Sequence, residues 1–171
     1  GGAEKWNYES CVKGGIGGSE EAVINMSEEF RKAGWFVEVY AHTDLALSPS
    51  GVRWYPISHW TGENDEPLDV AIWWRMPGSL ASMGTNAKQN HLWLHDMPVQ
   101  EAWPEGLWDT YDKVFVLSKY HHSVYDFIPE NRKFLTINGM DPALWVDETD
   151  LENDPHRVIW ASCPTRGLVN F

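Results

Sequence analysis

The stretch from Lys13 to Val23, KGGIGGSEEAV, places four glycines ahead of a helical pattern. Backbone N–H groups at the start of a helix have no partner within the helix, and with the helix dipole they favour negative charge or polar oxygen atoms. Glycines at this position let a ligand approach the main chain closely. The stretch therefore predicts either a site for a phosphate or a sugar, or a tight turn without a ligand.

Two well-known nucleotide-binding patterns do not fit this loop. The dinucleotide pattern G-x-G-x-x-G fails because the sixth position counted from Gly15 is Glu20, and no apolar strand precedes the loop in this chain. The lysine of the P-loop pattern is also absent. These mismatches count against a dinucleotide-dependent oxidoreductase, which stays a minor alternative.

The apolar stretch HLWLH ends at His95, which could be a purely structural histidine at the end of a strand. Asp96 comes next and could cap the following loop. His91 and His95 would lie roughly 13 Å apart in a strand, which is too far to bind one metal ion.

Hydrophobic spacing predicts the elements that would position these residues. Ala22, Val23, Met26 and Phe30 recur at helical spacing and predict a helix of about four turns, with Ser19 as its N-cap and a stop at Gly34. A second helix is expected over 119–127, with His121 and His122 on its surface. Apolar stretches predict strands at 35–40, 69–74, 91–95, 113–118, 133–137 and 157–162.

The alternation of strands and helices predicts an α/β fold with a parallel sheet. Because the apolar stretches are nearly continuous, the strands are expected to be buried on both faces. The acidic segment 147–155 has no periodicity and suits a linker or an exposed turn.

Composition narrows the class of protein. The 171 residues carry a net charge of -12, which argues against a nucleic-acid partner, and no apolar run is long enough for a transmembrane segment. Cys11 and Cys163 are far apart, so a disulfide framework is not expected. Most of the eleven tryptophans should fill the core, with a few free to stack on sugars or bases. We expect a cytoplasmic protein.

Several motifs together resemble the N-terminal part of a family 4 glycosyltransferase with the GT-B fold. They are GGSEEAVINMSEEFRKAGWFVEVYAH, LWLHDMP, KVFVLSKYHHSVY, INGMDPALW and ASCPTRGL, which occur in the order of that family and cover most of the chain. The resemblance implies a Rossmann-like parallel sheet with helices on both faces, which is one half of a GT-B fold.

The resemblance also implies an activity and a set of site residues. The activity is retaining transfer of a sugar from a nucleotide-sugar to an acceptor, without a metal or another cofactor. The missing D-x-D motif agrees with this, because metal-dependent transferases need such ligands to bridge a diphosphate. The implied catalytic residue is His95, which matches a histidine that the family places near the reacting sugar. Its neutral imidazole could donate a hydrogen bond to a sugar hydroxyl or stabilise developing charge. The implied substrate-binding residues are Gly17, Gly18, Glu20, Asp96, Asn138, Gly139 and Arg166.

Simpler roles remain open for three of these residues. Glu20 could be a first-turn carboxylate that complements the helix dipole. Asn138 and Gly139 could form an ordinary turn after a strand. Arg166 has only the role that the resemblance implies, which is to bind the donor diphosphate in a bidentate manner.

The chain departs from the family pattern at both ends of its fold. Residues 1–150 match the N-terminal domain, and residues 151–171 match the linker and the first strand of the donor domain, whose paired glutamates and lysine are missing. The chain is therefore expected to be inactive or weakly active alone, or to be a non-catalytic module that binds a sugar or a nucleotide. The first strand of the family sheet is also missing, so we expect Arg157 to Ser162 to insert there, in the same chain or by exchange in a homodimer.

Overall fold

The computed structural model describes residues 4–13, 16–63, 66–98, 103–104, 106–139 and 156. The chain divides into two units, residues 1–139 and 140–171, and every helix and strand below belongs to the first unit. The expected strand at 157–162 and Arg166 lie outside the described residues, so their predictions stay untested.

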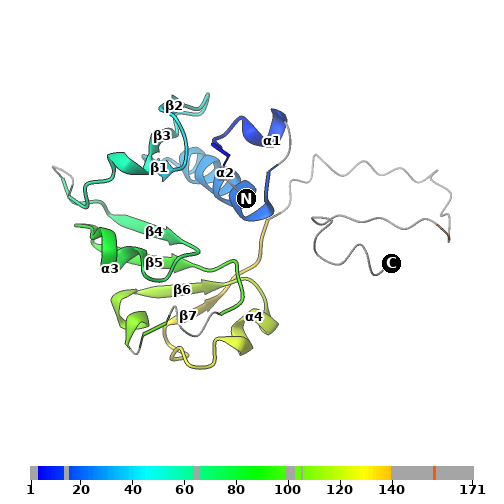
Figure 1. Ribbon diagram of the computed structural model, residues 1–171, viewed down its shortest axis with the longest axis vertical. Coiled ribbons are helices and arrows are strands. Elements are labelled where there is room, and N and C mark those ends of the chain that lie inside the picture. Colours follow the sequence, from blue (N-terminus) through cyan, green and yellow to red (C-terminus); the bar gives the residue numbers. More distant parts are fainter. Residues whose placement is uncertain are drawn as a thin grey trace. The chain divides into compact units, whose positions relative to one another are not determined.

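Four strands form a parallel sheet, in the order β4 (Val70–Trp74), β5 (Gln89–Trp93), β6 (Lys113–Val116) and β7 (Lys133–Leu135) (Figure 1). In the register of this sheet, Trp73 lies opposite Leu92, and Leu92 lies opposite Val114. The expected α/β fold with a parallel sheet is confirmed. β5 is displaced from its expected range of 91–95, since it begins and ends two residues earlier. His95 therefore lies in the loop that follows the strand.

Three further strands form a separate sheet, in the order β1 (Glu38–Ala41), β3 (Arg53–Pro56) and β2 (Ala46–Leu47). β1 pairs with β3 in parallel, and β2 pairs with β3 in antiparallel fashion. Of these three strands the sequence predicted only β1, and it placed the start of β1 three residues too early. Trp35 and Phe36 lie outside the strand, with exposed fractions of 49% and 63%. β2 has only two residues, and β3 contains an arginine and a proline, so no long apolar run marks either strand.

The helices are α1 (Ser10–Lys13), α2 (Gly18–Lys32), α3 (Ser79–Met83) and α4 (Lys119–Val124), with short 3-10 helices at Ile57–His59 and Leu107–Thr110. The helix after the glycines is confirmed, but its N-cap is Gly17 and not Ser19. Ser19 lies in the first turn, where its hydroxyl donates to Glu20 Oε2 at 2.8 Å. Gly34 follows the helix with φ +96°, a conformation that side chains disfavour, which agrees with the expected stop.

The two faces of the four-stranded sheet are covered unequally. On one face, α3, α4 and the 3-10 helix Leu107–Thr110 enclose the main core. The fully buried side chains of that core include Leu92, Leu94, Tyr111, Val114, Val116, Tyr125 and Ile128.

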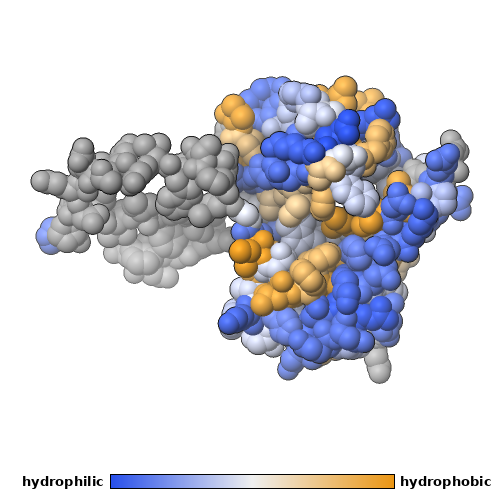
Figure 2. Space-filling view, turned by 180° about the vertical axis from the view of Figure 1, so that it is seen from behind, coloured by the Kyte–Doolittle hydropathy of each residue, from blue (hydrophilic) through white to orange (hydrophobic). Residues whose placement is uncertain are grey.

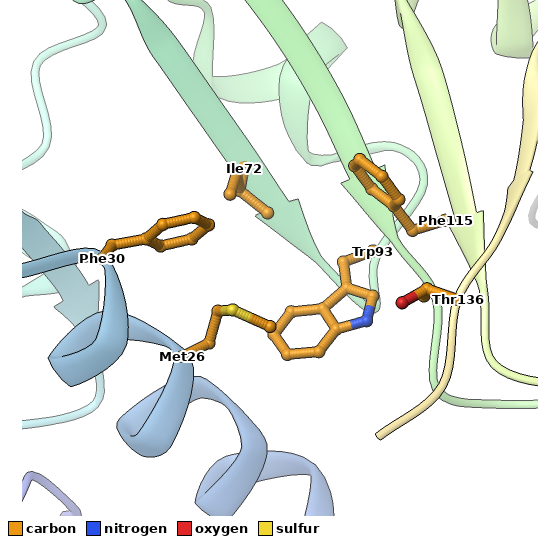
Figure 3. A pocket seen from close by; sticks show the side chains of 6 residues that line it. All are labelled: Met26, Phe30, Ile72, Trp93, Phe115 and Thr136. Atoms are coloured by element: carbon orange, nitrogen blue, oxygen red, sulfur yellow. The ribbon is translucent and has the colours of Figure 1, made fainter. Parts of the chain in front are cut away.

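α2 covers the opposite face only in part. Met26 and Phe30 point from α2 toward Ile72 and Trp93, as Figure 3 shows, and leave a pocket of about 110 Å³ between helix and sheet. Ile72 and Phe134 on this face have exposed fractions of 41% and 53%, so the expectation of burial on both faces is wrong. Figure 2 shows hydrophobic patches among hydrophilic residues on the face of the molecule seen from behind.

Among the residues that the structure describes, no helix is both long enough and apolar enough to cross a membrane.

Candidate functional site

The candidate site lies where the parallel strands end. β4 leads into Arg75, β5 leads through Leu94 into His95 and Asp96, and β6 leads into α4. The carboxyl ends of parallel strands meet at one edge of a sheet, where ligands bind in open α/β folds. The first turn of α2 brings Glu20 to the same edge, within 3.6 Å of Arg75.

His95 is enclosed by aromatic rings. Its ring centroid lies 4.5 Å from that of Trp93 and 6.4 Å from that of Trp74. Burial, assisted by the positive charge of Arg75, lowers the pKa of His95 from 6.5 to about 4, against an opposing effect of Asp96. Its Nε2 atom is buried without a hydrogen-bond partner among the described groups. At neutral pH His95 is thus an uncharged imidazole with one nitrogen free to bond.

Arg75 forms ion pairs with two carboxylates, those of Asp96 and Glu20. Its Nε donates to Asp96 Oδ2 at 2.6 Å, and its Nη1 lies 3.6 Å from Glu20 Oε1. The guanidinium also lies over the ring of Trp74, 5.2 Å from its centroid. Arg75 therefore links the first turn of α2 to the loop after β5.

The backbone of Arg75 is strained. Its φ is +65°, and no other non-glycine residue among those described has a positive φ. For a residue with a Cβ this conformation costs on the order of 1 kcal/mol. The main-chain N–H of Arg75 still donates to Trp93 O at 2.9 Å, so the turn away from the sheet begins directly after this bond. Strain of this kind is concentrated at functional sites.

Two side chains of α4 and its end fix the main chain of Asp96. Tyr125 Oη donates to Asp96 O at 2.9 Å, and His121 Nε2 lies 2.9 Å from the same oxygen. His121 Nδ1 accepts the N–H of Leu117, so the ring proton must be on Nε2, which donates to Asp96. Burial raises the pKa of Tyr125 to about 12, so its hydroxyl remains a donor.

His121 was expected on a helix surface, and this expectation is wrong. Its exposed fraction is 7%, because the Asp96 carbonyl and the Leu117 amide both need a partner at the start of α4. His122 lies on the outer side and meets Glu130 at 3.0 Å, as a surface position would allow.

Gly17 and Gly18, the two glycines of the loop that the structure describes, have different surroundings. A Cβ on Gly17 would clash with Glu20 Oε2, whereas a Cβ on Gly18 would meet nothing within 4 Å. The lack of a side chain at Gly17 therefore leaves the space that the Glu20 carboxylate occupies. Gly14 and Gly15 lie outside the described residues.

The structure brings His95, Asp96, Glu20 and Gly17 together, with Gly18 beside them in the chain. Asn138 and Gly139 follow β7 as exposed residues, and the described contacts do not connect them to this cluster. Within the described part of the chain, no three His, Cys, Asp or Glu side chains are placed to hold a metal ion.

Sequence reasoning missed three residues of the cluster. Arg75 carries a signal, since it directly follows the apolar stretch DVAIWW and precedes Met76 and Pro77. His121 and Tyr125 carry no such signal, because helical spacing alone does not show which side of a short helix faces a loop. Trp74 and Trp93 were recognised only as members of expected strands.

The arrangement suits hydroxyl groups better than phosphate. Arg75 is the cation of the cluster, and two carboxylates already balance it, so the three groups together carry negative charge. Carboxylate oxygens accept bonds from hydroxyls, and an uncharged imidazole can donate or accept one. The exposed carboxylate of Asp96 could thus accept hydrogen bonds from a polyhydroxylated ligand at the sheet edge, next to the buried imidazole of His95.

No protein-family model, no curated protein and no solved structure significantly matches this chain.

Proposed function

We propose that the chain is the N-terminal, acceptor-side half of a retaining, metal-independent glycosyltransferase of the GT-B type. The observation that carries the proposal is the buried and unpartnered Nε2 of His95, beside the Arg75, Asp96 and Glu20 cluster at the carboxyl edge of a parallel sheet. The order of the motifs along the chain supports it independently.

In this proposal His95 contacts the reacting sugar. Its uncharged imidazole bonds to a hydroxyl and stabilises charge that develops during transfer. Asp96 and Glu20 accept hydrogen bonds from hydroxyls of the bound sugar, and Arg75 holds both carboxylates in place. Gly17 and Gly18 form the floor of this site at the start of α2.

The donor nucleotide-sugar would be held largely elsewhere. Arg166 is the residue that the family resemblance assigns to the donor diphosphate, and the negative cluster around Arg75 does not itself favour a diphosphate. The 171-residue chain is therefore expected to bind an acceptor sugar weakly and to show no appreciable transfer.

Binding is the first test. Amide chemical shifts of the labelled chain are recorded while simple mono- and disaccharides and common nucleotide-sugars are added one at a time. We expect a sugar without a nucleotide to shift the amides of Gly18, Glu20, Arg75 and Asp96. Shifts confined to other regions, or none with any sugar, would contradict the proposal, and so would robust transfer by the chain alone.

A two-domain enzyme tests the chemistry. A donor-binding domain of a family 4 glycosyltransferase is joined after Phe171. His95→Ala is then compared with His91→Ala, a change inside β5 and four residues before His95. We expect His95→Ala to abolish transfer and His91→Ala to retain it, with normal circular dichroism in both. Sugar binding without transfer in the unsubstituted fusion would favour the alternative, a non-catalytic binding module.

A further inference from the structure

One imidazole connects three segments near the carboxyl edge of the sheet. His121 Nδ1 accepts from the N–H of Leu117, which directly follows β6, at 3.0 Å, and Nε2 donates to Asp96 O at 2.9 Å. The main chain of His121 lies in the first turn of α4, where its N–H donates to Oγ of the N-cap Ser118. The end of β6, the start of α4 and the loop after β5 therefore meet at one side chain.

His121 lies at the position that closes a capping box. In that motif, the side chain three residues after the N-cap bonds back to a main-chain N–H at the helix start, and it is usually glutamate or glutamine. The imidazole does this by accepting from Leu117, and it also donates to Asp96, which an ionised glutamate could not do. His121 is only 7% exposed, so water has little access to replace either bond.

Both bonds exist together only while the imidazole is uncharged. A neutral ring donates from one nitrogen and accepts at the other, whereas a protonated ring carries a hydrogen on both and accepts at neither. After protonation, the hydrogen on Nδ1 would point at the N–H of Leu117, which lies 3.0 Å away. The contact with Leu117 must then break, even though Nε2 can still donate to Asp96 O.

The titratable or charged groups around His121 in the described part of the chain come from the loop after β5 and from α4 with its C-cap. They are His95, Asp96, Lys119, His122 and Tyr125. Burial lowers the pKa of His95 to about 4 and raises that of Tyr125 to about 12. Neither of these two groups therefore changes charge between about pH 5 and 8, where an unperturbed imidazole does.

We propose that His121 is a positioning residue that holds the loop after β5 to the start of α4 only while its imidazole is uncharged. At neutral pH it ties Asp96, and with it the ion pair to Arg75, to the end of β6. In acid the contact with Leu117 opens, and Asp96 is no longer linked to β6 through this ring. The positioning does not depend on the proposed function, but its effect on sugar binding does.

The unsubstituted chain tests the tautomer and the release. NMR follows the nitrogen shifts of His121 and the protection of the Leu117 amide against hydrogen exchange, from about pH 8 to about pH 5. We expect hydrogen on Nε2 at the upper pH, and at least a tenfold loss of Leu117 protection in acid. The amide of Val114, buried in β6, controls for global unfolding. Hydrogen on Nδ1 instead, or constant Leu117 protection, would overturn the proposal.

Two substitutions separate the two bonds of His121. His121→Asn places an acceptor oxygen near the position of Nδ1, and His121→Gln places a donor near that of Nε2, and neither side chain titrates. We expect His121→Asn to protect the Leu117 amide at every pH, and His121→Gln to leave it unprotected at every pH. His122→Asn, on the outer side of α4, should keep the pH dependence. Dependence that persists in His121→Asn would overturn the proposal.

Sugar binding shows whether the release reaches the site, and this arm rests on the proposed function. The amide-shift titration with a simple sugar is run at about pH 7.5 and about pH 5. We expect binding at least threefold weaker in acid for the unsubstituted chain and for His122→Asn, but not for His121→Gln. Equal affinity at both pH values in the unsubstituted chain, or an equal fall in His121→Gln, would overturn the positioning role. No binding at either pH would contradict the proposed function alone, because the exchange measurements need no ligand.

Discussion

The closed face of the four-stranded sheet and the cluster at its carboxyl edge are held together by different forces. On the closed face, Leu92, Val114 and Val116 are fully buried, and Tyr111 satisfies its hydroxyl by donating to Pro77 O at 2.6 Å. At the edge, Arg75 has a strained backbone and pairs with two partly exposed carboxylates, and His95 keeps a nitrogen without a partner.

This comparison indicates that the closed face provides most of the folding stability, whereas the carboxyl edge holds the groups suited to binding and chemistry. Burial of apolar side chains is the main source of folding free energy, whereas ion pairs near the surface contribute little. A strained residue and an unsatisfied imidazole cost stability, and proteins keep such features at functional sites. Substitutions on the closed face should therefore change stability, and those at the edge should change binding.

The largest effect is expected from Leu92→Ala. Removing a fully buried leucine side chain leaves a cavity and should cost about 2–5 kcal/mol in the free energy of unfolding. Urea denaturation measures it. The matched control is Ile72→Ala in the neighbouring strand, which is 41% exposed and should cost clearly less. Equal losses would show that the partly covered face contributes as much as the closed one.

The next effect is a dependence of stability on pH through His95. Its pKa is about 4 in the folded chain and 6.5 when unperturbed, so the unfolded chain binds the proton more readily. The stability it contributes is complete above pH 6.5 and is lost as the pH falls toward 4, by no more than about 3 kcal/mol. His95→Asn should flatten this part of the profile. An NMR titration that places the pKa near 6.5 would contradict the described burial.

A smaller effect separates the backbone of Arg75 from its side chain. Arg75→Gly and Arg75→Ala both remove the guanidinium, but glycine accepts φ +65° without strain. The glycine variant should therefore be more stable than the alanine variant by about 1 kcal/mol, as measured by urea denaturation. Both should lose sugar binding. A more stable alanine variant would show that the loop relaxes when the arginine is removed.

The smallest effect compares the two adjacent glycines. Gly18→Ala meets open space at the first position of α2 and should stabilise the chain by about 0.5 kcal/mol. Gly17→Ala should displace Glu20 from Arg75 and weaken sugar binding with little change in Tm. Unchanged binding in Gly17→Ala would remove Glu20 from the site.

Much of the main sheet could be predicted from the sequence, because its four strands are apolar and separated by helical or turn segments. β2 and β3 could not, since they are short, and β3 is placed by its pairing with β1 on one side and β2 on the other. The site was predicted in part. The family resemblance pointed to His95, Asp96 and Glu20, whereas His121 and Tyr125 reach Asp96 only through the placement of α4.

The sequence by itself determined the α/β alternation, the helix after the glycine loop and the position of His95 at the end of an apolar stretch. These features are local, because they depend on spacing and on residues adjacent in the chain. Only the tertiary structure decided that Gly17 makes room for Glu20, that Arg75 joins α2 to the loop after β5, and that Trp60 packs against both Tyr40 in β1 and Trp73 in β4. Each of these depends on contacts between segments far apart in sequence, whose geometry no local pattern specifies.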